Sequence, residues 1–189
     1  MIILASASPR RKKLMQEEIS SCFTIIIPEI DESLSFKKFK DVRHIVKDIA
    51  KRKCLKVANE HPDDLVIAAD TVVVINKRII GKPKNKEDAF NILKTLSNNK
   101  HYVYTGFAIH QKDKFICSTT KSTVYFNDLS DELINAYIDS VSQMDKAGAY
   151  GYQYNQDFAL VKKINGSITN VIGFPVEDIK KVLKDNFVL

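Results

Sequence analysis

The segment Leu65–Ile75 constrains the fold more strongly than any other part of the sequence. It reads LVIAADTVVVI, and every residue except Asp70 and Thr71 is apolar, with β-branched side chains in the majority. A strand that is covered on both faces has such a continuous apolar run, and strands of this kind occur mainly in parallel sheets between layers of helices. The segment therefore predicts an α/β protein with a buried central strand.

Strands and helices alternate along the rest of the sequence. Apolar or alternating runs predict further strands at residues 2–5, 22–27, 78–80, 102–111, 115–126 and 158–164, with an acidic loop at 28–35. Cap residues and helical spacing predict helices after Ser8, at 41–60, from Asn85 to 96, from Ser130 to 138, and from Pro175. We therefore expect one domain over residues 1–189. Its predicted fold is α/β, with an elongated, twisted, mixed sheet, flanking helices, and two lobes around a central cleft.

Composition excludes several classes of protein. No stretch approaches the roughly 20 apolar residues that span a membrane, and the four-residue apolar run at the N-terminus is too short for a signal peptide. Three scattered cysteines show no zinc-binding or disulfide spacing, which favours a cytoplasmic protein. The net charge of +6 is spread along the whole chain. Nucleic acid is not expected as a partner, because no basic arm or helix-turn-helix signature is present.

The first strand leads directly into a basic helix start. Ser8 is a good N-cap, Pro9 suits the first helical position, and Arg10–Lys13 place four cations in the first turn. Cations are unfavourable there, because the helix N-terminus carries partial positive charge. A bound anion would offset that repulsion, so we expect Ser6, Arg10 and Arg11 to bind phosphate. The alternative is a basic surface turn with an ordinary cap.

Asp70 is the most informative polar residue, since a carboxylate inside an apolar strand must be paired, hydrogen-bonded or bound to a cation. It could simply accept hydrogen bonds from backbone groups or from Thr71. Together with Asp31 or Glu32 from the acidic loop, it would offer hard oxygen ligands for Mg²⁺ or Mn²⁺. A solvated acidic loop is the alternative for those two residues.

Two lysines complete the candidate set. Lys53 follows Ile49 by four residues, so it borders the apolar stripe of the 41–60 helix and is a candidate for pointing inward. Lys82 lies in Gly81-Lys82-Pro83, but no phosphate-binding P-loop precedes it. Carboxylates, a divalent metal and a ring of cations suit the attack of water on a phosphoric anhydride.

Taken together, five motifs resemble the Maf family of nucleoside triphosphate pyrophosphatases, once described as septum formation inhibitors. They occur in the family's order and spacing and cover nearly the whole chain. In sequence they are Leu4–Arg11, Ala69-Asp70-Thr71, Gly81-Lys82-Pro83, Asp145–Gln153 and Asn170–Pro175. The resemblance implies a fold related to the inosine triphosphate pyrophosphatases, a divalent metal and a homodimer. It also implies hydrolysis of a nucleoside triphosphate to its monophosphate and pyrophosphate.

The resemblance also implies roles for individual residues. Asp70 would be the proton acceptor and, with Glu32, a metal ligand. Substrate selection would fall to Arg10, Thr71 and Gln153. Phosphate or metal contacts would come from Ser6, Glu32, Lys53 and Lys82.

The late motif resembles the branch of the family that acts on dTTP and UTP. The amide of Gln153 could pair with both the carbonyl and the N–H edge of a pyrimidine, although it could also face solvent beside a structural glycine turn. The family usually has glycine after this glutamine, whereas this chain has Tyr154–Asp157. The alternatives are therefore the same chemistry on 7-methyl-GTP, ITP or a modified pyrimidine nucleotide, or a non-catalytic regulator that acts on cell division or binds nucleic acid.

Overall fold

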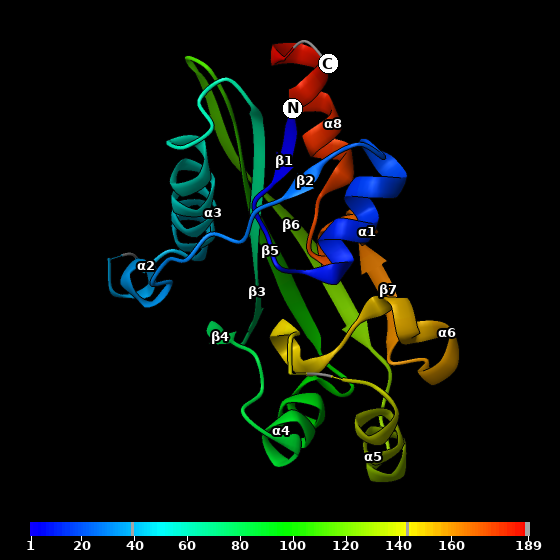
Figure 1. The fold of residues 1–189 in the computed structure, drawn as a ribbon. Coiled ribbons are helices and arrows are strands. Elements are labelled where there is room, and N and C mark those ends of the chain that lie inside the picture. Colours follow the sequence, from blue (N-terminus) through cyan, green and yellow to red (C-terminus); the bar gives the residue numbers. More distant parts are fainter. Residues whose placement is uncertain (39, 143, 188–189) are drawn as a thin grey trace. The chain divides into compact units, whose positions relative to one another are not determined.

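The computed structural model describes residues 1–38, 40–142 and 144–187. In this part of the chain the strands form one seven-stranded mixed sheet in the order β2-β1-β3-β5-β6-β7, with β4 paired to β3 (Figure 1). The strands are β1 Ile2–Leu4, β2 Thr24–Ile25, β3 Leu65–Ile75, β4 Arg78–Ile80, β5 Lys100–Gln111, β6 Lys114–Phe126 and β7 Val161–Asn165. Strand β1 is parallel to β2 and β3, whereas β3–β4 and β6–β7 are antiparallel. The predicted mixed α/β sheet is confirmed.

The helices connect these strands. They are α1 Pro9–Glu18, α2 Ser33–Lys38, α3 Val42–Ala58, α4 Lys86–Leu96, α5 Asp131–Ser140, α6 Asn155–Phe158, α7 Ile168–Ile172 and α8 Val176–Asn186, with short 3₁₀ turns η1 Ala147–Ala149 and η2 Tyr152–Tyr154. The predicted caps of α1, α4 and α5 are confirmed, because Ser8, Asn85 and Ser130 each accept a hydrogen bond from a backbone N–H of the first turn. None of the helices in the described residues is long and apolar enough to span a membrane.

The chain divides into two compact units. The first comprises Met1–Thr71, Tyr104–Thr120 and Thr169–Leu189, and the second comprises Val72–Val103 and Lys121–Ile168. The two units correspond to the two predicted lobes. The cleft and the single domain over residues 1–189 stay predictions.

In the first unit, the alternation of side chains along the strands builds two separate cores. Leu65, Ile67 and Ala69 of β3 pack in one cluster with residues of α1 and α8. Val66 and Ala68 pack in the other cluster with residues of α3. Helix α3 therefore covers one face of the strands, and α1 and α8 cover the other (Figure 1).

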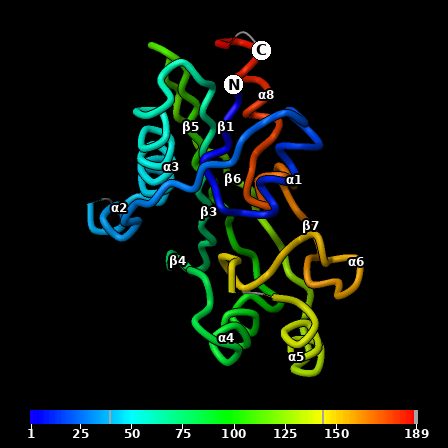
Figure 2. The backbone as a smooth tube through the Cα atoms, viewed as in Figure 1, coloured from blue at the N-terminus to red at the C-terminus, as the bar shows by residue number. Residues whose placement is uncertain are grey.

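Helices α1 and α8 come from opposite ends of the chain and lie side by side (Figure 2). Lys180 of α8 forms an ion pair with Glu18 of α1 at 2.8 Å. Beneath this exposed pair, Met15 of α1 and Ile179 of α8 belong to the same buried cluster. Burial of apolar surface, worth about 25 cal/mol per Å², contributes more to this contact than an exposed ion pair does.

The second unit begins with a tight hairpin. Asn76 and Lys77 both have positive φ, 50° and 62°, which is the backbone of a type I′ turn between β3 and β4. Helices α4 and α5 then pack together. Two exposed ion pairs join them at their surface, Lys86 with Asp139 at 2.7 Å and Lys94 with Asp131 at 2.6 Å.

Several predicted boundaries were wrong. The strand predicted at residues 158–164 begins at Val161, because Phe158 ends helix α6. Ala159 follows this helix with φ +48°, a left-handed conformation that a strand does not contain. The Asn155 side chain accepts from Val161 N at 2.6 Å and donates to Val161 O at 3.0 Å, so it binds the first residue of the strand. Part of the predicted acidic loop is helix α2, strand β2 is shorter than residues 22–27, and helix α7 was not predicted.

Gly106 generates the first prediction. A Cβ at this position would press on the backbone carbonyl of Val46 and lie 2.7 Å from Lys47 N, so α3 would have to move away from β5. We expect Gly106→Ala to lower the free energy of unfolding by about 3 kcal/mol, the upper end for overpacking, and the melting temperature by roughly 6–12 °C. Thermal unfolding followed by circular dichroism measures both.

Gly81→Ala is the matched control, since a Cβ there would meet nothing within 4 Å. It should leave the melting temperature within about 2 °C of the wild-type value. Equal melting temperatures for the two variants would contradict the close approach of α3 to β5.

Candidate active site

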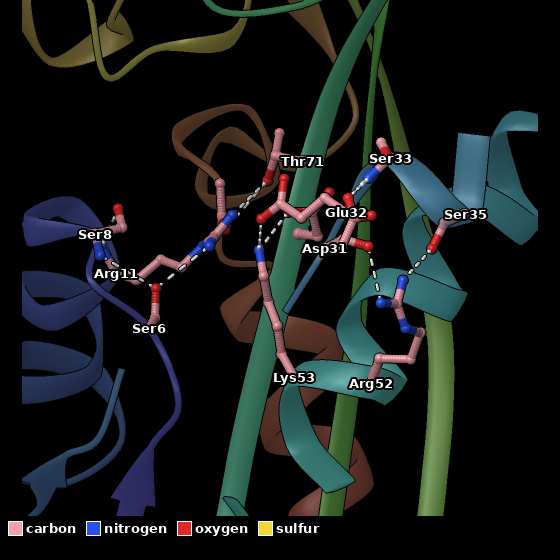
Figure 3. Close-up of polar contacts among 12 residues, drawn as sticks. Ser6, Ser8, Arg11, Asp31, Glu32, Ser33, Ser35, Arg52, Lys53 and Thr71 are labelled. Atoms are coloured by element: carbon pink, nitrogen blue, oxygen red, sulfur yellow. Dashed lines mark hydrogen bonds and ion pairs between the residues drawn. The ribbon is translucent and has the colours of Figure 1, made fainter. Parts of the chain in front are cut away.

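The end of the β3 core places two adjacent polar residues on opposite faces of the sheet. Asp70 continues the row of Val66 and Ala68 toward α3, and Thr71 continues the row of Ile67 and Ala69 toward α1. Both predicted residues lie in the first unit. Asp70 contacts Lys53 of α3, and Thr71 contacts Arg11 of α1 (Figure 3).

On the α3 face, Lys53 is bound between two carboxylates. Its Nζ lies 2.8 Å from Asp70 Oδ1 and 2.6 Å from Glu32 Oε1. The Asp70 and Lys53 side chains are only 11% and 12% exposed, whereas the Glu32 side chain is 45% exposed. The structure thus brings together three of the predicted site residues and confirms that Lys53 points inward (Figure 3).

Burial dominates the electrostatics of Asp70. Desolvation raises the pKa of its carboxyl above the ordinary value, and Glu32 adds to the rise, while Lys53 and Arg11 oppose it. A carboxylate whose pKa is raised is a stronger base once it is ionised, and the neighbouring cations favour the ionised form.

The acidic loop that carries Glu32 is fastened to α3 by Arg52. Arg52 Nη2 donates to Asp31 O at 2.8 Å, and Nη1 donates to Ser35 Oγ at 3.0 Å. The Asp31 carboxylate accepts from Ser33 N at 3.0 Å within its own turn. Glu32, and not Asp31, therefore contacts Lys53 (Figure 3).

On the other face, Arg11 is held by three hydrogen bonds to the protein. Its Nε donates to Gly173 O at 2.8 Å, Nη1 to Ser6 Oγ at 3.3 Å, and Nη2 to Thr71 Oγ1 at 3.1 Å. Burial lowers the pKa of the Arg11 guanidinium, and the Asp70 carboxylate opposes that shift. These bonds order the guanidinium beside the start of α1, where its charge adds to that of the helix dipole.

The start of α1 holds the remaining predicted residues of this unit. Ser8 Oγ accepts from Arg11 N at 3.4 Å, and Ser6 Oγ accepts from Ser8 N at 3.2 Å. Arg10 is half-buried, and its charge contributes to the lowered pKa of Arg11. Backbone N–H groups, hydroxyls and two guanidinium groups at a helix N-terminus make a suitable anion site.

The second unit contains Lys82 and Gln153, and both side chains are exposed. Their two motifs are joined by a hydrogen bond from Gly148 N to Gly81 O at 3.0 Å. Gly148 has φ +74°, a backbone conformation that glycine adopts without strain. The carboxamide of Gln153 folds back over Gly151, where a Cβ would lie 2.7 Å from both its oxygen and its nitrogen.

Sequence reasoning missed the polar residues that support these motifs. Lys146 is 4% exposed and donates to Ser142 O and to Asp145 Oδ1. His101 Nε2 lies 2.7 Å from the hydroxyl of Tyr150, and burial lowers the pKa of His101 to about 4, so the ring is neutral at physiological pH. Lys146 lies within a quoted motif and could have been singled out, whereas His101 lies in an ordinary strand with no local signal.

The residues present fit a divalent metal that arrives with phosphates. Within residues 1–38, 40–142 and 144–187 no group of three or more His, Cys, Asp or Glu side chains is placed to hold a metal by itself. Glu32 and Asp70 supply two carboxylates, which matches Mg²⁺ sites that take one or two carboxylates and complete their ligands with phosphate oxygens and water. In this structure the Lys53 ammonium contacts both carboxylates.

Comparison with known proteins finds one family model and several relatives that match nearly the whole chain. The family model described as "Maf-like protein" matches residues 1–186. The chain is 41% identical to a dTTP/UTP pyrophosphatase of Thermosipho melanesiensis over 188 residues, which cover 100% of this chain and 99% of the relative. It is 41% identical to a dTTP/UTP pyrophosphatase of Clostridioides difficile over 188 residues, which cover 98% and 95%.

The fold also occurs in a solved structure. The Staphylococcus aureus Ham1 protein aligns with a TM-score of 0.52 over 97% of this chain and 98% of its own, at 13% identity. At that identity the likeness shows a shared fold alone.

Proposed function

The chain belongs to the Maf family, as its motifs predicted, and we propose that it hydrolyses dTTP and UTP to their monophosphates and pyrophosphate. The observation that carries this proposal is the buried Asp70 carboxylate, which has a raised pKa and touches Lys53. The family and the relatives' names support hydrolysis of a phosphoric anhydride, and the site supplies a base and several cations for it.

Each residue of the first unit has a proposed task. Asp70 is the proton acceptor for the attacking water, because it is the buried acid with the raised pKa. Lys53, Arg10 and Ser6 contact the phosphates, and the ordered guanidinium of Arg11 adds positive charge beside them. In the second unit, we assign a phosphate contact to the exposed Lys82.

The metal is part of the proposal. Glu32 and Asp70 would hold Mg²⁺ or Mn²⁺ together with phosphate oxygens. When bound, the cation would offset the negative charge of the triphosphate. Lys53 would then leave at least one of its two carboxylates and engage a phosphate with its ammonium group.

Selection of the base is proposed to depend on Gln153, with Arg10 and Thr71 contributing to substrate selection. A carboxamide presents one acceptor and two donor hydrogens, so it can pair with the O4 and N3–H edge shared by thymine and uracil. Its position over Gly151 supports this proposal, because the missing side chain at 151 leaves room for the amide.

We further propose that the protein acts in the cytoplasm and forms a homodimer. The three cysteines Cys22, Cys54 and Cys117 are all free, which suits a reducing compartment. The homodimer rests on the family resemblance.

A nucleotide panel tests the proposed function. Purified protein is given each nucleoside triphosphate, including 7-methyl-GTP and ITP, with Mg²⁺, with Mn²⁺ or with a chelator, and all phosphate products are separated by ion-exchange chromatography. We expect monophosphate and pyrophosphate in equal amounts from dTTP and UTP, with turnover lost in chelator.

The other outcomes are distinct. Turnover of 7-methyl-GTP or ITP in place of dTTP would overturn the assignment of Gln153 and keep the chemistry. Full turnover in chelator would overturn the proposed requirement for a divalent metal. No turnover of any nucleotide by the folded, metal-loaded protein would favour the non-catalytic regulator.

Gly151 generates a prediction on specificity. Its φ of −128° is compatible with alanine, but the added Cβ would displace the carboxamide of Gln153. We expect Gly151→Ala to leave the melting temperature nearly unchanged and to lower kcat/KM for dTTP and UTP about tenfold, the loss of roughly one hydrogen bond to the base. Steady-state kinetics and thermal unfolding check the two parts.

Gln153→Ala provides the control for this effect. If Gly151 acts only through Gln153, the double variant should match Gln153→Ala alone. Wild-type kcat/KM of Gly151→Ala on both pyrimidine nucleotides would show that Gln153 does not recognise the base from its position over Gly151.

A further inference from the structure

Behind Thr71 lies a buried hydroxyl that belongs to none of the sequence motifs. Thr105 of β5 is fully buried, and its Oγ1 lies 2.9 Å from Thr71 Oγ1. The same hydroxyl donates to the backbone carbonyl of Asn170 at 3.2 Å. Thr105 occupies the same face of β5 as Phe107 and Ile109, where an apolar side chain of equal size would also fit.

Thr71 and Thr105 form a hydrogen-bonded pair between Arg11 and the segment at residues 170–173. Either hydroxyl can donate within the pair, because Thr105 has Asn170 O at 3.2 Å as a further acceptor and Thr71 has Gly173 O at 3.4 Å. In both arrangements Thr71 Oγ1 accepts from Arg11 Nη2, since a guanidinium only donates. The network therefore runs from Arg11 through the two threonines to backbone carbonyls, and bonds in such a network strengthen one another.

The segment at residues 170–173 also binds Arg11 through its Nε. Gly173 O accepts from Arg11 Nε at 2.8 Å, three residues after Asn170. Gly173 has φ +114°, and a Cβ there would lie 3.3 Å from Thr71 Oγ1, so the segment passes closely over this threonine. Three of the five N–H groups of Arg11 are used in its protein contacts, which leaves one on each terminal nitrogen.

We propose that Thr105 is a positioning residue of the active site, which orients Thr71 and through it the guanidinium of Arg11. The inference rests on the proposed function, since it gives Arg11 and Thr71 their task. Thr105 holds the Thr71 hydroxyl through their 2.9 Å contact, so that Thr71 Oγ1 stays in place to accept from Arg11 Nη2. The two remaining N–H groups of Arg11 are thereby held in one orientation for the phosphates of the substrate.

Three variants test this role by kinetics. Thr105→Val keeps the shape and removes the hydroxyl, Thr105→Ser keeps the hydroxyl, and Thr71→Val removes the group through which Thr105 acts. We expect Thr105→Val to lower kcat/KM for dTTP and UTP about tenfold, as loss of one hydrogen bond predicts, and Thr105→Ser to stay within about twofold of wild type. In the Thr71→Val background, Thr105→Val should have no further effect.

A second readout does not depend on turnover. The Nε–H proton of Arg11, identified by its absence in Arg11→Lys, is followed by ¹⁵N NMR for exchange with solvent. We expect exchange to be at least several-fold faster in Thr105→Val than in wild type and unchanged in Thr105→Ser. If Thr105→Val does not fold, Thr105→Ala carries the same comparison.

Each contrary result overturns the proposal. Wild-type exchange of the Arg11 proton in folded Thr105→Val would show that Arg11 does not depend on Thr105, whether or not the protein turns over any nucleotide. An equal loss of kcat/KM from Thr105→Val in the wild-type and Thr71→Val backgrounds would show a purely structural role. Failure of the proposed function would instead appear as absent turnover with the exchange difference intact.

Discussion

The ion pair between Asp70 and Lys53 is the interaction on which the site depends. A carboxylate in the middle of an apolar strand is costly to bury, and a cation at 2.8 Å offsets that cost while leaving the carboxyl with a raised pKa. Removing Lys53 would take the ion-pair partner from the buried Asp70 carboxylate, whereas removing Asp70 would leave Lys53 paired with Glu32 alone. The pair also draws the acidic loop onto α3, since Glu32 contacts the same ammonium group. The stability of the site and the proposed chemistry therefore rest on the same two side chains.

Strand alternation explains why two adjacent residues can serve different purposes. Asp70 faces α3 and its lysine, while Thr71 faces α1 and Arg11, and no contact between the two side chains is required. The apolar residues that precede them on each row fill the two cores, so packing fixes the register that aims the polar pair. A shift of one residue along β3 would exchange the two faces and separate both residues from their partners.

The sequence predicted those site residues that a local pattern marks. Asp70 stood out because a carboxylate in an apolar run demands a partner, and Lys53 could be predicted to point inward from its spacing to the apolar stripe of α3. Thr105 could not be predicted, because a threonine in an alternating strand is ordinary and its partners are 34 and 65 residues away. The strand start at Val161 was missed because nothing in the sequence pattern indicated the short helix α6 or the left-handed Ala159 that follows it. The contact of Glu32, rather than Asp31, with Lys53 depends on the turn of the acidic loop, which the residue pattern alone did not predict.

The most direct measurement of the central claim is the rate of pyrophosphate release from dTTP by Asp70→Asn, with Mg²⁺ present and nucleotide binding measured separately. Asparagine keeps the shape of the side chain and cannot act as a base, so the rate should fall by about 10²- to 10⁴-fold while the variant remains folded and binds nucleotide. Asp131→Asn, which alters an exposed ion pair on α5, should retain the wild-type rate. A folded Asp70→Asn protein that releases pyrophosphate within tenfold of wild type would contradict the role of Asp70 as the general base.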